Sequence, residues 1–241
     1  MSIDSSHRPG RRSVASSVGA VFSEDREGPQ LTVLPRSRVR RAIDVGIAGL
    51  LLLVSSPLLL VIAVAVVITD SGPVLFRQTR VGYRGRTFTM LKFRTMRVDC
   101  DDSVHREFVT RQIVEDSPQP ASADGLFKLA NDSRVTWVGA LLRRTSLDEL
   151  PQLVNVLRGE MALVGPRPSL PWEAVLFTPR HCSRFLVPPG ITGLWQVSGR
   201  SRLTMREALE LDLRYVDQQG LLFDLRILAR TLRVVLSRQA R

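Results

Sequence analysis

Two adjacent acidic residues, Asp148 and Glu149, lie in the basic stretch from Arg143 to Pro168, which reads RRTSLDELPQLVNVLRGEMALVGPRP. Nearby arginines can keep a carboxylate ionised, so one member of the pair could attack a phosphorus centre while the other holds a hard cation such as Mg²⁺. The residue types and their spacing therefore suit phosphate chemistry. An exposed acidic pair at a helix start, with Ser146 or Thr145 near the N-cap, is the plainer alternative.

The composition restricts the classes of protein to which the chain can belong. Its 241 residues suffice for one catalytic domain, and its formal net charge of +11 favours anionic partners such as nucleic acid, lipid headgroups or phosphorylated substrates. It contains no helix-turn-helix, zinc-finger or RNA-binding signature, so we expect no nucleic-acid partner. Cys100 and Cys182 lie far apart and outside any CxxC or Cys/His cluster, which favours a reducing, cytosol-facing protein without a disulfide framework or zinc site.

The segment from Val45 to Thr69 is an apolar run of 25 residues that must lie in the membrane. As one straight helix it would measure about 38 Å, enough to cross a hydrocarbon core of roughly 30 Å. However, Pro57 divides it into two arms too short to cross alone, and arginines flank both ends. We therefore expect a re-entrant helix-break-helix anchor over residues 37–72, with the break at Ser56 and Pro57 and both ends cytoplasmic. A Pro-kinked spanning helix is the alternative.

The regions around this anchor have different characters. Residues 1–36 are rich in Ser, Arg, Gly and Pro, and we expect them to be disordered or to lie along the membrane surface. Residues 73–241 should form a catalytic domain that begins with a β-hairpin, whose strand-like residues 74–76 and 88–93 enclose a turn near residues 82–85. Residues 221–236 predict a C-terminal amphipathic helix that either lies on the leaflet or packs on the core. Four arginines around the hairpin favour headgroup binding: Arg77, Arg80, Arg84 and Arg86.

From about Arg38 to the carboxyl terminus the chain resembles the bacterial sugar transferases, the monotopic polyprenyl-phosphate phosphoglycosyl transferases. The resemblance rests on segments in the family's order: the Ser-Pro break at 56–57, KFR at 92–94, the Asp-Glu stretch, VGPRP at 164–168, PPGITGLWQVSGRSR at 188–202 and ELDLRYV at 210–216. It implies an α+β, mainly helical membrane protein with a re-entrant anchor, a small β-hairpin and amphipathic interfacial helices.

The resemblance also implies roles for individual residues. Asp148 would be the nucleophile, and Glu149 would be catalytic and a ligand of Mg²⁺. Lys92 would contact the donor diphosphate, and two prolines would fix the backbone around Arg167 so that its guanidinium clamps phosphate. A structural ion pair for Lys92, a turn at Arg167 and ordinary surface charge at Asp212 remain the alternatives. The full set expected to bind substrate is Lys92, Arg94, Arg143, Arg144, Arg167, Arg200 and Asp212.

The implied reaction moves a sugar-1-phosphate from a nucleotide diphosphate sugar, most often a UDP-sugar, to a membrane polyprenyl phosphate, with release of UMP. It would begin the assembly of an exopolysaccharide, capsule, O-antigen or glycoprotein glycan at the cytoplasmic face of the bacterial inner membrane. Anionic lipid, downstream glycosyltransferases and a second copy of the chain are the other expected partners. A non-enzymatic basic membrane adaptor and a nucleotide-sugar pyrophosphatase are the rival functions.

Overall fold

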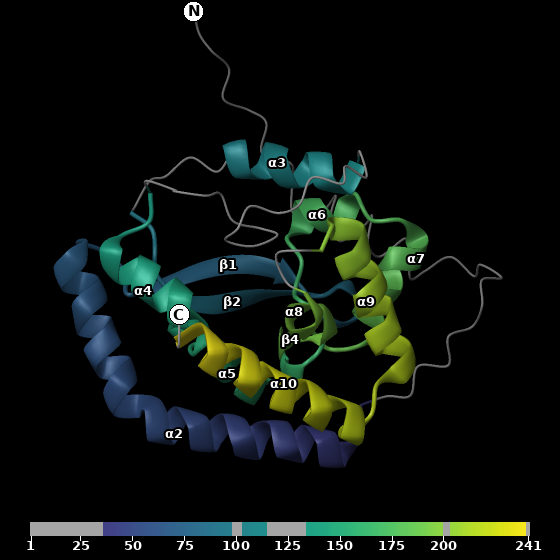
Figure 1. Ribbon diagram of the computed structural model, residues 1–241, viewed down its shortest axis with the longest axis horizontal. Helices are drawn as coiled ribbons and strands as arrows, with labels where there is room; N and C mark the ends of the chain where they lie inside the picture. Colours follow the sequence, from purple (N-terminus) through teal and green to yellow (C-terminus); the bar gives the residue numbers. More distant parts are fainter. Residues whose placement is uncertain (1–35, 98–102, 115–133, 200–202, 240–241) are drawn as a thin grey trace, which may run out of the picture.

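The structure is a computed structural model that describes residues 36–97, 103–114, 134–199 and 203–239. The predicted disordered segment, apart from Arg36, and the candidate site residue Arg200 lie outside these ranges. The described chain is mainly helical, as predicted (Figure 1). Its elements are α2 (Arg38–Thr69), β1 (Leu75–Val81), η1 (Tyr83–Gly85), β2 (Thr87–Phe93), α3 (Ser103–Val114), α4 (Trp137–Thr145), η2 (Leu147–Glu149), α5 (Gln152–Arg158), β3 (Ala162–Val164), α6 (Pro171–Val175), α7 (Pro179–Cys182), η3 (Ser183–Leu186), β4 (Gly190–Thr192), α8 (Leu194–Ser198), α9 (Met205–Gln218) and α10 (Leu221–Gln239).

The predicted hairpin is confirmed and runs through the middle of the molecule (Figure 1). Strands β1 and β2 pair antiparallel, with Phe76 opposite Lys92 and Arg80 opposite Phe88. Residues directly opposite each other project to the same face of a hairpin, and alternate residues share that face. Phe76, Gln78, Arg80 and Lys92 therefore project to one common face. A second small sheet, the parallel pair β3–β4, joins Ala162 to Gly190 and Val164 to Thr192.

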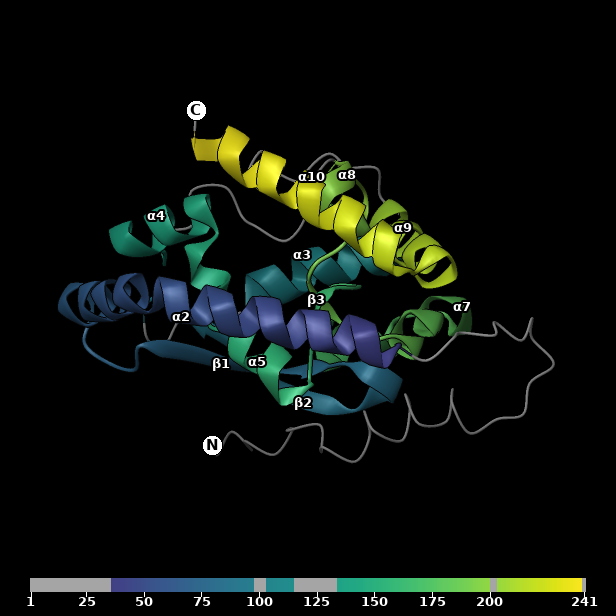
Figure 2. The ribbon, with the colours of Figure 1, turned by 90° about the horizontal axis from the view of Figure 1, so that it is seen from below.

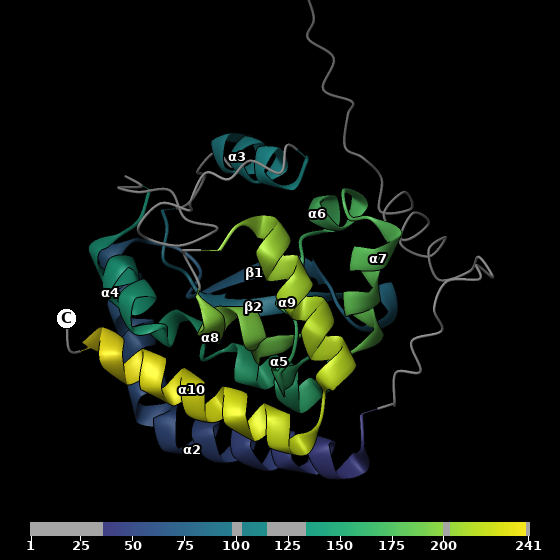
Figure 3. The same cartoon turned by 45° about the vertical axis from the view of Figure 1, so that its right-hand side comes forward.

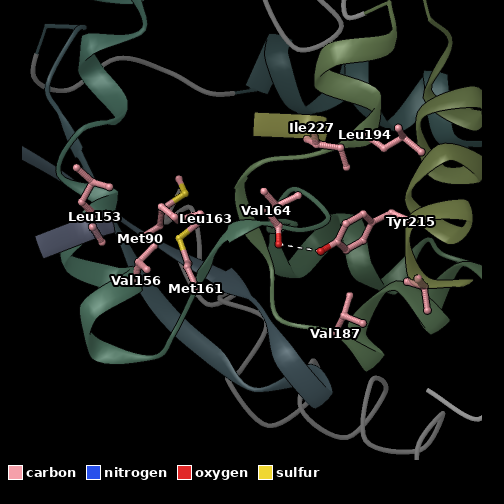
Figure 4. Packing of buried hydrophobic residues seen from close by; sticks show 12 residues of the cluster. Met90, Leu153, Val156, Met161, Leu163, Val164, Val187, Leu194, Tyr215 and Ile227 are labelled. Atoms are coloured by element: carbon pink, nitrogen blue, oxygen red, sulfur yellow. Dashed lines mark hydrogen bonds between the residues drawn. The ribbon is translucent and has the colours of Figure 1, made fainter. Parts of the chain in front are cut away.

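The buried cluster in Figure 4 connects this second sheet with the helices around it. Its members come from α2, β2, α5, β3, α8, α9, α10 and the connecting segments, and include Met90, Val156, Val164, Tyr215 and Ile227. The hydroxyl of Tyr215 donates a hydrogen bond to the Val164 carbonyl at 3.0 Å, drawn as the dashed line. The core thus fixes β3, and the last residue of this strand, Val164, is the first residue of the VGPRP segment.

The apolar run forms one continuous helix, α2, which passes through Pro57 and bends along its length (Figure 1). The predicted break is therefore a bend within a helix. Pro57 has no N–H for the Leu53 carbonyl four residues earlier, and the Ser56 hydroxyl donates to that carbonyl at 2.8 Å. Only 11% of its most apolar window is buried, so α2 has the length and composition of a membrane segment without being a core helix.

Both arms of α2 pack on the same globular body. Ala48, in the first arm, belongs to the cluster drawn in Figure 4, whereas Ile62 and Val66, in the second arm, pack with Phe93 and Val138. Figure 2, seen from below, shows α2 lying along this body, with the hairpin on one side and α10 on the other. Between the packed positions, α2 exposes large apolar side chains: Leu50, Leu51, Leu53, Val54, Leu58, Leu60 and Val61.

A buried polar network fixes the first arm of α2 to α10. The Asp224 carboxylate accepts hydrogen bonds from Arg40 Nε at 3.0 Å and Nη2 at 2.8 Å, and from the Tyr215 hydroxyl at 2.8 Å. This hydroxyl shares its one proton between Asp224 and the Val164 carbonyl. Arg36 contributes a further ion pair with Asp44 at 2.5 Å. Burial, followed by the nearby Asp224 charge, raises the pKa of Tyr215, so its hydroxyl keeps its proton and donates.

The C-terminal helix α10 packs on the core, as one interpretation of its amphipathic pattern predicts, and its contact with the leaflet stays a prediction. Ile227 is buried in the core, while Leu222 and Leu232 are 72% and 66% exposed. Figure 3 shows α10 running across the body beside α8 and α9. One face of α10 therefore packs on the core, and another presents leucines to the surroundings.

Glycine at position 139 permits the close contact between α4 and the segment after β2. A Cβ atom there would lie 2.1 Å from the Thr95 carbonyl oxygen, which is backbone and cannot rotate away. We expect Gly139→Ala to cost about 3 kcal/mol or more of stability, since α4 must shift or overpack. Chemical denaturation of the purified variant in detergent would measure this loss. Gly49→Ala, where a Cβ would have no neighbour within 4 Å, is the control; it should cause no loss and could raise stability by up to about 1 kcal/mol through helix propensity.

Candidate active site

The acidic pair lies in a tight turn between two short helices. Helix α4 ends at Thr145, and Ser146 follows in the left-handed conformation with φ 61°. This conformation is unusual for a residue other than glycine, and it reverses the chain so that η2 presents Asp148 and Glu149. Asp148 is 9% exposed, so the alternative of a simply exposed acidic pair is wrong for this residue.

The hairpin brings Lys92 to this turn. Its Nζ atom lies 2.8 Å from Glu149 Oε1, and both side chains are partly buried. The fold thus brings two predicted site residues, Lys92 and Glu149, into direct contact, with Asp148 next to Glu149 in the chain. The Lys92 ammonium group and the carboxylates of Asp148 and Glu149 thus lie at one place, where phosphate and a cation could both bind.

The side chain of Asn155 fixes the distance between the turn and the hairpin. Its Oδ1 accepts from the Leu91 amide at 3.1 Å, and its Nδ2 donates to the Thr89 carbonyl at 2.8 Å. Asn155 therefore takes the place of a neighbouring strand along the edge of β2 and holds α5 there. It also donates to Glu160 at 2.6 Å. Since α5 directly follows the acidic pair, this clamp sets the position of η2 relative to Lys92.

Hydrogen bonds fix the Pro-Arg-Pro segment at every carbonyl from Pro166 to Ser169. Pro166 accepts from the Gly190 amide at 2.9 Å, and Ser169 accepts from the Val81 amide at 2.8 Å. Two buried arginines bind the carbonyls between them: Arg184 donates to Arg167 at 2.7 Å, and Arg80 donates to Pro168 at 3.0 Å. Arg167 itself is partly exposed, although its neighbours on both sides are buried. Its side chain thus projects from a rigid backbone.

Arg80 is buried at 7% exposure, so its predicted contact with lipid headgroups is wrong, whereas Arg77, Arg84 and Arg86 are exposed. Its guanidinium also donates to Gln78 Oε1 at 2.6 Å and 3.0 Å. Burial and the nearby charge of Arg167 lower the pKa of Arg80 to about 10, and Glu173 and Glu149 oppose that shift. Arg80 therefore lies within electrostatic range of both the Pro-Arg-Pro arginine and the acidic turn.

Asp212 lies under the Pro-Arg-Pro segment. It is 1% exposed, and its Oδ2 is 2.5 Å from Arg184 Nη2. Burial raises the pKa of Asp212 to about 6, although the charges of Arg184 and Arg167 lower it. The alternative of surface charge is wrong for this residue. Asp212 and Arg184 both line a small cavity that also involves Arg167 and Trp195.

The other candidates have different positions. The Arg94 guanidinium binds the end of α2: it donates to the carbonyls of Asp70 and Ser71, and it lies 3.4 Å from Asp70 Oδ2. Its assignment to substrate binding stays a prediction, and the contacts observed are structural. Arg143 and Arg144 occupy the last turn of α4, beside the acidic turn, with Arg144 exposed.

Comparison with known proteins decides the family. The sequence pattern of the family described as "Bacterial sugar transferase" matches residues 35–238. The chain belongs to the bacterial sugar transferases. It is 43% identical over 196 residues to "Exopolysaccharide production protein ExoY" of Rhizobium meliloti, covering 81% of this chain and 84% of that protein. It is 41% identical to "UDP-glucose:undecaprenyl-phosphate glucose-1-phosphate transferase" of Caulobacter vibrioides, covering 82% and 71%.

Other relatives of this sugar transferase are longer. "Undecaprenyl-phosphate galactose phosphotransferase" of Salmonella typhimurium is 38% identical over 200 residues, which cover 83% of this chain but 41% of that protein. The resemblance predicted from the sequence motifs is therefore confirmed, and the adaptor alternative loses its support.

Two functional candidates of this sugar transferase were missed by the sequence interpretation, Arg80 and Asn155. Nothing in the sequence distinguishes a buried arginine from the exposed arginines near it. An asparagine in a helix usually faces solvent. The only hint was the position of Asn155 on the apolar face of its helix, between Leu153 and Val156. Trp195 is buried at 6% exposure in the core, where it also lines the small cavity beside Arg167.

The donor set at the acidic turn suits Mg²⁺. Among the described residues, no cluster of three or more His, Cys, Asp or Glu side chains could hold a metal ion. Mg²⁺, however, is usually bound through one or two carboxylates together with substrate phosphates and water. Asp148 and Glu149 can supply such carboxylates, with Lys92 competing for Glu149.

Proposed function

We propose that this sugar transferase is a phosphoglycosyl transferase that moves a sugar-1-phosphate from a UDP-sugar to undecaprenyl phosphate or a similar polyprenyl phosphate. The observation that carries the proposal is the partly buried Lys92–Glu149 pair beside the buried Asp148. The relatives named for UDP-glucose and undecaprenyl phosphate supply the substrate class. The product, a lipid diphosphate sugar, would begin exopolysaccharide assembly and pass to downstream glycosyltransferases.

In the first step, an Asp148 carboxylate oxygen attacks the phosphorus that carries the sugar. The bond from that phosphorus to the oxygen bridging to the uridine phosphate breaks, and UMP leaves with the electron pair. Lys92 and Arg167 would offset the charge on the donor phosphates. Glu149 would hold Mg²⁺, and the ion would supply Lewis-acid stabilisation of the developing charge.

In the second step, a phosphate oxygen of the polyprenyl phosphate attacks the same phosphorus and releases Asp148. The bond from phosphorus to the Asp148 oxygen breaks as the new bond to the polyprenyl phosphate forms, and the carboxylate returns unchanged. A buried nucleophile suits this scheme, because water that reached the phosphosugar-aspartyl intermediate would hydrolyse it.

The anchor would bring the lipid acceptor to this site. Contact of both α2 arms with one globular body supports a re-entrant geometry, because such a helix has both ends on the same side of the membrane. The Ser56 hydroxyl, which satisfies the carbonyl left by Pro57, supports a bend inside lipid. We place the domain at the cytoplasmic face of the inner membrane, where soluble nucleotide sugars occur.

The test is UMP release by protein purified in membrane mimetic, with Mg²⁺, undecaprenyl phosphate and a panel of UDP-sugars. We expect release with at least one sugar, with a requirement for the lipid acceptor and for Mg²⁺. Release without lipid would instead identify a nucleotide-sugar pyrophosphatase. Absence of release with every UDP-sugar would contradict the proposed donor class.

A further inference from the structure

The Pro-Arg-Pro segment is bound from beneath by the buried ion pair of Arg184 and Asp212. Arg184, in η3, donates through Nη2 to the Arg167 carbonyl at 2.7 Å and to Asp212 Oδ2 at 2.5 Å. Its Nη1 donates to the Ser169 hydroxyl at 2.7 Å. One planar guanidinium therefore connects α9 to two positions of the segment.

The burial of this pair indicates a specific role and distinguishes it from an ordinary surface ion pair. Arg184 and Asp212 are 6% and 1% exposed, and taking two charges out of water carries a large desolvation cost. Such pairs are often no more stabilising than apolar residues of the same volume, so stability alone is a weak reason for one here. The prolines on both sides of Arg167 carry no N–H, which leaves carbonyls as the main groups by which the segment can be held.

We propose that Arg184 and Asp212 are positioning residues that orient Arg167 toward the donor phosphates. Arg184 fixes the carbonyl of Arg167 itself, so a shift of this guanidinium moves the base of the Arg167 side chain. Asp212 in turn fixes Arg184. This inference rests on the proposed function for the nature of the substrate, but the orientation of Arg167 can be measured without any substrate.

Arg184→Lys is the informative variant, because lysine keeps the charge but cannot bind the carbonyl, the hydroxyl and the carboxylate in one plane. Arg180→Lys is its matched control. Arg180 also comes from a short helix and pairs with α9, through Glu210 at 2.7 Å, but its side chain is 71% exposed. The hydrogen bond that Arg180 makes goes to α9 and not to the Pro-Arg-Pro segment.

The first measurement is hydrogen–deuterium exchange over residues 164–170. We expect faster exchange in Arg184→Lys than in wild type and in Arg180→Lys, and exchange that stays unchanged in Arg184→Lys would overturn the proposal. The second is steady-state kinetics. We expect KM for the UDP-sugar to rise at least fivefold in Arg184→Lys while KM for the polyprenyl phosphate stays the same. An equal rise in both constants, or no rise, would also overturn it.

The pH profile separates positioning from a general loss of folding. Because burial raises the pKa of Asp212 to about 6, its carboxylate is lost as the pH falls through that value, and with it the ionic contact to Arg184. We expect the difference in donor KM between wild type and Asp212→Asn to be full near pH 7.5 and to narrow below pH 6. A pH-independent difference would contradict the role of the carboxylate. If wild type turns over no UDP-sugar, the proposed function fails, while the exchange measurement still decides the positioning of Arg167.

Discussion

Replacement of Asp148 by Asn is expected to abolish sugar phosphate transfer while the protein remains in the membrane. The asparagine amide has nearly the shape of the carboxylate but is a poor nucleophile, so no covalent intermediate should form. Loss of a nucleophile in other covalent enzymes lowers kcat by roughly 10⁴-fold or more, and we expect at least about 10³-fold here. UMP release measured at equal amounts of membrane-bound protein would test this.

A second variant tests the division of roles within the acidic pair. Glu149→Gln leaves Asp148 in place but removes the ionic partner of Lys92 and the proposed Mg²⁺ ligand. We expect residual transfer whose dependence on Mg²⁺ shifts to higher concentration. Asp148→Asn should instead show no transfer at any Mg²⁺ concentration, because its defect is chemical. Robust transfer by Asp148→Asn would disprove the nucleophile assignment, whatever the behaviour of Glu149→Gln.

Replacement of Asp224 by Ala is expected to cause the largest loss of stability. The change leaves Arg40, which is 8% exposed, without the carboxylate that binds two of its nitrogens, and it removes the acceptor of the Tyr215 hydroxyl. Removing one partner of a buried ion pair costs about 3–5 kcal/mol, because the remaining charge stays buried and unpaired. Chemical denaturation in detergent, followed by tryptophan fluorescence, would measure the change.

Two further variants provide reference values against which the loss of stability in Asp224→Ala can be compared. Tyr215→Phe keeps the ring but removes the hydrogen bonds to Val164 and Asp224, and it should cost about 1–3 kcal/mol. Glu107→Ala removes an ion pair with Arg111 in which both side chains are 64% exposed, and it should change stability by about 0.5 kcal/mol or less. If Asp224→Ala and Glu107→Ala lowered stability equally, the buried network would not contribute the stability that we assign to it.

The sequence by itself determined the elements that depend on local pattern or on motif. The hairpin follows from short strand-like runs around a Gly-rich turn, and the membrane helix follows from a long apolar run. The Asp148–Glu149 pair and its family were identified from a motif of contiguous residues. Each of these features requires only neighbours in the chain, so no knowledge of the tertiary fold was needed.

The tertiary structure alone decided which charged residues are buried and what they bind. In the sequence, Arg80 is indistinguishable from Arg77 and Arg84, yet it is buried against Gln78 and Pro168 while the other two are exposed. Arg94 lies two residues after Lys92 in one motif, and strand alternation would put both on the same face, but β2 ends at Phe93 and Arg94 binds the end of α2 instead of the acidic turn.

The same holds for contacts between distant segments. Asp212 was expected to bind substrate, and its partner Arg184 lies 28 residues away. Asn155 acts on β2 across 64 residues of chain. A pairing of this kind depends on the packing of helices and strands around one core, and the cost of burying a charge selects the partner. A single sequence shows the charges, but only the fold shows which of them had to be paired.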